Sequence, residues 1–172
     1  MDLSGKPASV AEPVELVATL FTDLPLVEQT FRGLLLDISG SSLAGAISPH
    51  GMEAQHSYGD ADFDSSARDI KVRARPANTA ARSALVELEK RGFRPETAIT
   101  FETAGDVDSR EDAWALCSLY AAEVQGWILT AYLSYGEAVD RLGTDDGLLH
   151  VPIGGKHRSV LIASSALQQL IG

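Results

Sequence analysis

The chain has 172 residues, of which 45% are apolar and 22% are charged, so it is long and apolar enough to form one domain with its own core. Its formal net charge of −10 disfavours nucleic acids and anionic membranes as partners, because both are bound through clustered Lys and Arg. The single cysteine, Cys117, excludes an internal disulfide and a cysteine-rich zinc site. No apolar stretch is long enough to predict a membrane span.

The first elements are predicted from the spacing of apolar residues. Residues 1–13 contain Gly, Ser and Pro without an apolar run, which predicts a flexible leader before a single domain at 14–172. Alternation predicts a strand at 14–21, with Val14, Leu16, Ala18 and Leu20 on one side. Helical spacing over 26–38 predicts a helix that ends near Gly40.

The segment 41–66 is predicted to be a long loop with one short strand at 43–47. It contains three aspartates at alternate positions, Asp60, Asp62 and Asp64, a spacing that can bind calcium from a loop. The EF-hand pattern fails, because Ser65 stands where glycine is needed and Lys71 where a glutamate is needed. We therefore interpret the aspartates as a solvated acidic loop, and no metal or other cofactor is predicted.

Strands and helices alternate after residue 68. The strand at 69–75 places Ile70, Val72 and Ala74 on one face and a basic row, Lys71, Arg73 and Arg75, on the other. Helices are predicted at 79–91, 108–125 (capped by Asp108 or Ser109), 136–142 and 165–171, and strands at 98–102, 127–133, 148–153 and 158–163. The expected fold is α/β (α+β), with a mixed β-sheet, helices packed on it and a C-terminal β-hairpin plus short helix.

No catalytic motif is present. The phosphate-binding GxxxxGK[ST], the dinucleotide GxGxxG, the zinc-binding HExxH and the GxSxG elbow are all missing. Cys117 falls on the apolar face of a predicted helix and is expected in the core. Nothing in the pattern brings the four histidines, at positions 50, 56, 150 and 157, together.

Exposed acidic and aromatic residues are the candidates for a partner interface. Trp114, Tyr120, Trp127, Tyr132 and Tyr135 gather in a short stretch, and Trp and Tyr are enriched at interfaces, although core positions explain most of them. The candidate interface residues are Asp60, Asp62, Asp64, Asp106, Asp108, Asp145 and Asp146. A helix dipole alone can account for acidic residues near position 108.

The C-terminal half resembles a known group of proteins. The run LEKRGFRPETAITFE at 88–102 is followed by a long helix, by GWILTAYL, GLLHVPIG and KHRSVLIAS, and by a short helix. This layout, marked by Gly92, Phe93, Pro95, Gly126, Leu149 and Arg158, resembles small bacterial α/β domains suspected to be immunity proteins of polymorphic toxin systems. The resemblance implies an antitoxin that binds a cognate, basic toxin by protein–protein contact and needs no catalytic group.

Two other interpretations stay open. One is a small-ligand-binding domain or enzyme whose site is assembled from distant residues, for example His56, Asp62 and His150. The other is a structural subunit of a larger assembly, such as a phage or secretion component. A homodimer is compatible with all three, and the lack of a disulfide fits the cytoplasm.

Overall fold

The computed structural model describes most of the domain predicted from residue 14 onward. The described residues are 14–27, 29–31, 33–34, 45–47, 53–58, 68–79, 82–104, 107–130, 133–153 and 157–171. The predicted leader at 1–13 and residues 154–156, between the two strands of the predicted hairpin, therefore lie outside them.

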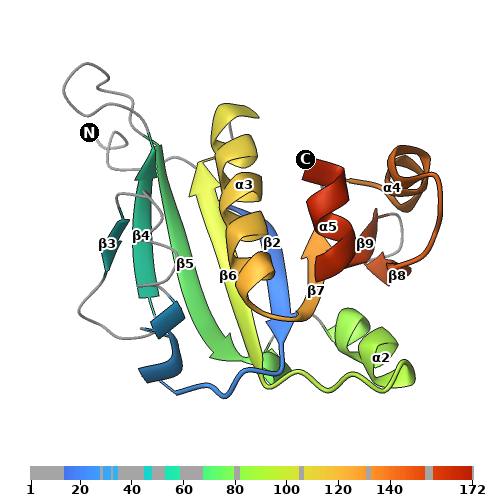
Figure 1. Cartoon of the computed structure of the whole chain (residues 1–172), viewed down its shortest axis with the longest axis horizontal. Helices are drawn as coiled ribbons and strands as arrows, with labels where there is room; N and C mark the ends of the chain where they lie inside the picture. Colours follow the sequence, from blue (N-terminus) through green and yellow to red (C-terminus); the bar gives the residue numbers. More distant parts are fainter. Residues whose placement is uncertain are drawn as a thin grey trace, which may run out of the picture.

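The centre of the fold is one eight-stranded sheet with the order β3-β4-β5-β6-β2-β7-β9-β8 (Figure 1). Each pair of neighbouring strands is antiparallel, so the described strands contain none of the parallel pairs that a mixed sheet requires. The strands are β2 (Val14–Thr22), β3 (Gly45–Ile47), β4 (Glu53–Tyr58), β5 (Arg68–Pro76), β6 (Thr97–Ala104), β7 (Gly126–Thr130), β8 (Leu148–Ile153) and β9 (His157–Ala163).

The α/β class, the helices on the sheet and the C-terminal hairpin with its short helix are confirmed. The expected mixed sheet is wrong for a topological reason. Strands β6 and β7 are joined through a helix and run in the same direction, as in a parallel crossover. They do not pair with each other, because β2 lies between them and is antiparallel to both.

The helices form unequal layers on the two faces of the sheet. The helices are α2 (Arg82–Lys90), α3 (Val107–Glu123), α4 (Tyr135–Leu142) and α5 (Ser164–Ile171), with a short 3₁₀ turn, η2 (Ala77–Thr79). Helices α3, α4 and α5 share one apolar core with the inner residues of the sheet, where Tyr120 meets Phe101 edge to face. Helix α2 packs through Ala84 and Leu88 on Phe21, Ala98, Val151 and Leu161 of the other face.

Strand β2 is covered on both faces, which explains why Val17 to Phe21 are all buried. A β-bulge between Leu16 and Ala18 shifts the register with β6. It also interrupts the simple alternation predicted from the sequence, because Val17 is buried while Leu16 is 52% exposed.

The segment 41–66 is not one continuous loop. It contributes β3 and a second strand, β4, which pairs with β5 along its whole length and puts Ala54 opposite Val72. Two helix details also differ from expectation. Helix α3 begins at Val107, so Asp108 lies inside it and is not its cap. Helical spacing predicts Leu85, Val86 and Leu88 on the buried side of the helix at 79–91, but Val86 is 44% exposed and Ala84 is buried.

Candidate functional site

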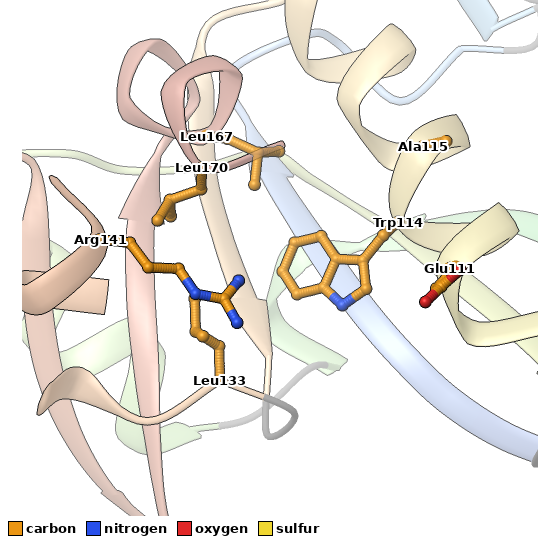
Figure 2. Close-up of a pocket in the computed structure, with 7 residues that line it drawn as sticks. All are labelled: Glu111, Trp114, Ala115, Leu133, Arg141, Leu167 and Leu170. Carbon is orange, nitrogen blue, oxygen red and sulfur yellow. The ribbon is translucent and has the colours of Figure 1, made fainter. Parts of the chain in front are cut away.

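A groove of about 500 Å³ opens between helices α3, α4 and α5. We call it the helical groove. Its residues come from distant parts of the chain, and Figure 2 shows them around one space. Glu111, Trp114 and Ala115 come from α3, Leu133 from the turn before α4, Arg141 from α4, and Leu167 and Leu170 from α5.

The position of Trp114 follows from the pattern of α3. The buried residues recur at helical spacing and face the sheet: Ala113, Leu116, Cys117, Tyr120 and Ala121. Trp114 lies on the flank of this stripe, and it is only partly buried. A large indole at the border of the core leaves part of its ring surface open to the groove.

The α4 wall is held by signals at both helix ends. Ser134 Oγ accepts a hydrogen bond from the Glu137 backbone N–H at 3.1 Å, and Glu137 Oε1 accepts one from the Ser134 N–H at 3.2 Å, which forms a capping box. Gly143 ends the helix at φ 73°, with its N–H bonded to the Val139 carbonyl. These bonds fix the short helix that carries Arg141.

The charged groups of the groove are placed asymmetrically. In Figure 2 the Arg141 guanidinium points toward the Trp114 indole, whereas Glu111 lies on the other side of the indole. The floor of the groove is apolar, because it is formed by two leucines, of which Leu133 is 6% exposed and Leu167 is fully buried. The groove therefore combines an apolar floor, an aromatic face, one cation and one carboxylate.

A second feature lies along α4 and the turn that follows it. Four carboxylates there are exposed, Glu137, Asp140, Asp145 and Asp146, and we call them the acidic edge. Asp146 also lines a smaller hollow of about 280 Å³ against α5.

The turn of the acidic edge is ordered by several hydrogen bonds. The Asp146 N–H donates to Thr144 Oγ1 at 3.2 Å and the Leu148 N–H donates to the Asp145 carbonyl at 3.1 Å. Gly147 has a φ of 79°, and its carbonyl accepts from Ala163 of β9 at 2.8 Å. The two aspartates thus stand on a turn that is anchored to the sheet.

The structure describes only some of the predicted interface residues. Asp145 and Asp146 are exposed, as a contact residue must be. Asp108 lies on α3, but its side chain is not among those described, and Asp60, Asp62, Asp64 and Asp106 fall outside the described residues. Their role in binding stays a prediction.

The sheet separates the histidines proposed for an assembled site. His56 lies on β4 and His150 on β8, six strand positions apart. At about 4.8 Å per strand the two backbones are roughly 29 Å apart, so His56 and His150 do not share a site. His150 instead lies beside Tyr135, with ring centroids 5.4 Å apart.

Cys117 is fully buried in the core, as its place on an apolar helix face predicts. Burial raises the pKa of its thiol far above the ordinary value, because the thiolate would lose its hydration. A thiol in this state is neither a nucleophile nor a metal ligand. Among the described side chains, no group of three His, Cys, Asp or Glu residues could hold a metal ion.

Sequence reasoning did not find the helical groove, because its walls meet only in the folded chain. Two local signals were present, however. Ser134 followed by Glu137 three residues later is a capping-box pattern that marks the start of α4. Helical spacing also predicts Trp114 on the apolar face of this helix, and the structure places it at the border of that face, partly buried.

No family model, curated protein or solved structure matches the chain. Within the described residues, no helix is both long and apolar enough to cross a membrane. The helical groove and the acidic edge are therefore the features that bear on function.

Proposed function

We propose that the chain is an immunity-type protein that binds and neutralises a cognate bacterial toxin by protein–protein contact. The observation that carries the proposal is the acidic edge, four exposed carboxylates on a helix and turn beside two hollows in the helical layer. The proposed partner surface is basic, and the proposed location is the cytoplasm.

The fixed geometry of the acidic edge supports a binding role. The capping box holds Glu137, and the turn hydrogen bonds hold Asp145 and Asp146, in place before any partner arrives. A preorganised surface loses little conformational entropy on binding, so more of its contact energy appears as affinity. Carboxylates that face a basic partner also speed the encounter by long-range attraction.

The adjacent hollows supply the apolar part of such a contact. Trp114 and Leu170 are partly buried and border the helical groove, while Leu142 and Ala166 border the smaller hollow. Protein interfaces commonly have an aromatic anchor region surrounded by a polar rim. The α4–α5 side of the molecule offers both within one surface.

The test is affinity capture from the native host with the wild-type chain and with Asp145→Lys/Asp146→Lys. We expect the wild type to retain one stoichiometric protein that is toxic when produced alone and harmless when produced with this chain. The double variant should weaken that binding by about tenfold or more, because two attractive charges become repulsive.

Glu89→Lys/Glu96→Lys is the matched control, since both residues are exposed and lie at the end of α2 and just before β6. It changes the net charge by the same amount away from the acidic edge, and it should bind normally. Equal binding by all three chains would remove the acidic edge from the proposal. Capture of a partner that is not toxic, or capture of no partner, would overturn the proposed toxin-neutralising function.

A further inference from the structure

The structure contains two arginine–tryptophan pairs that differ in one respect. On the α2 face, the Arg91 guanidinium carbon lies 5.7 Å from the Trp127 ring centroid, a cation–π contact. On the opposite face, Arg141 and Trp114 border the helical groove and point toward one another. No cation–π contact joins this second pair in the described part of the chain, and Trp114, which is partly buried against the core, also lines the groove.

Glu137 interacts electrostatically with Arg141 but does not form a salt bridge with it. Glu137 is one helical turn away, but its Oε1 accepts the Ser134 N–H at 3.2 Å and so is held at the start of α4. Among the described side chains, no carboxylate lies within salt-bridge distance of Arg141. Glu111, the other acidic residue of the groove, lies on the far side of the indole (Figure 2).

The remaining walls favour an apolar ligand of modest size. Leu133, Leu167 and Leu170 form the floor and side of the groove beside the indole. Its volume of about 500 Å³ lies in the range of small-molecule sites, which combine apolar walls with a few polar groups that set orientation. A guanidinium above such a floor pairs best with a carboxylate, since the two planar groups can share two hydrogen bonds.

We propose that the helical groove binds a small aromatic carboxylate, with the ring on the Trp114 indole and the leucines and the carboxylate on Arg141. The inference goes beyond the proposed function, and although both use Trp114 and Leu170 of the helical groove, it is tested through Arg141 and not through the aspartates of the acidic edge. The ligand is a free small molecule, and it adds a second binding activity to the protein.

The test uses 2-naphthoate as the probe and nuclear magnetic resonance as the readout. The chain has two tryptophans, so a ¹⁵N-labelled sample gives two indole N–H signals, which Trp127→Phe assigns. We expect 2-naphthoate to shift the Trp114 signal saturably, with a dissociation constant of about 1 mM or lower, a value consistent with its number of atoms. The Trp127 signal is the internal control and should stay in place.

Two comparisons test the role of the charge. Neutral 2-naphthamide should bind at least about tenfold more weakly than 2-naphthoate, and Arg141→Met should weaken 2-naphthoate binding to the same degree, because both remove a charge-assisted hydrogen bond. Arg91→Met is the matched variant and should bind normally. The dispersed amide spectrum of each variant verifies that it remains folded.

Three results would overturn the proposal. They are equal binding of acid and amide, normal binding by the Arg141 variant, and equal shifts of both indole signals. Absence of any shift at about 10 mM probe would overturn it as well. Failure of the toxin proposal is distinguishable from these results, because it is tested by protein capture with changes at Asp145 and Asp146.

Discussion

Gly126 is, among the glycines in the described part of the chain, the one with the least room for a side chain. It is the first residue of β7 and pairs with Thr22 of β2. A Cβ placed on it would lie closer than 3.0 Å to the carbonyl oxygen of Phe21, which is backbone and cannot rotate away. In the sequence, a glycine after a long predicted helix indicates only that the helix ends there. It does not reveal this close approach of two strands.

Gly126→Ala is therefore expected to destabilise the protein by about 3 kcal/mol or more, since relief of the clash requires the two central strands to separate. Urea unfolding measures the change. Gly136→Ala is the control, because a Cβ there meets nothing closer than Ser134 Oγ at 4.0 Å. In a helix that change should be neutral or stabilising by up to about 1 kcal/mol, and a similar loss in both variants would contradict the argument.

Single-residue burial was predictable where a strand is regular. Ile70, Val72 and Ala74 of β5 are buried and the intervening basic residues are partly exposed, as alternation predicts. The same reasoning was wrong for Leu16, because a bulge changes the facing of side chains and leaves no sign in the sequence. Periodicity predicts side-chain direction only as far as the register is unbroken.

At the scale of elements, helix α4 is short, and its capping box links its stability to pH. Hydrogen bonds with the backbone and side chain of Ser134 lower the pKa of Glu137 below its ordinary value of 4.5, and Arg141 adds to this. A carboxyl with a lower pKa in the folded state stabilises that state above the ordinary pKa. The contribution is lost as the pH falls through the lowered value.

Glu137→Gln should consequently reduce the free energy of unfolding at pH 7 and have much less effect at an acidic pH below the lowered pKa of Glu137, where the wild-type carboxyl is protonated as well. Urea titrations of both proteins at the two pH values measure this difference. Glu89→Gln, on the exposed end of α2, controls for the general loss of a negative charge. An equal deficit for Glu137→Gln at both pH values would show that the ionised capping box is not the cause.

Strong apolar periodicity predicts the helices and the C-terminal hairpin, but the weak apolar pattern of β4 does not predict a strand. The sequence EAQHSY offers little apolar content to mark a strand. What places it in the sheet is its pairing with β5, a tertiary effect that no local window contains. For the same reason the helical groove could not be foreseen, because Trp114, Leu133, Arg141 and Leu167 become neighbours only after three helices have packed.

At the scale of the whole molecule, β2 connects two half-sheets. On one side lie β6, β5, β4 and β3, and on the other lie β7, β9 and β8. Among the described strand pairs, none joins the two groups except through β2. The two halves should consequently unfold as one unit.

Leu20→Ala tests that expectation, because Leu20 is fully buried at the centre of β2. The loss should be about 2–5 kcal/mol. Tryptophan fluorescence, which reports the C-terminal half, and far-ultraviolet circular dichroism, which reports the whole sheet, should shift together. Val86→Ala, at an exposed position of α2, should change stability by less than about 0.5 kcal/mol. Separate unfolding transitions by fluorescence and by circular dichroism would contradict the expectation that the two half-sheets unfold as one unit.

The central position of β2 also matters during synthesis. It is the first strand described along the chain, yet residues 23–96 must be made before β6 can pair with it, and β7 follows only after α3. Until then an apolar strand leaves the ribosome with both hydrogen-bonding edges open, a state prone to aggregation. A nascent chain stopped before β7 would hold that strand paired on one side at most, so the yield of folded protein depends on how quickly translation reaches residue 130.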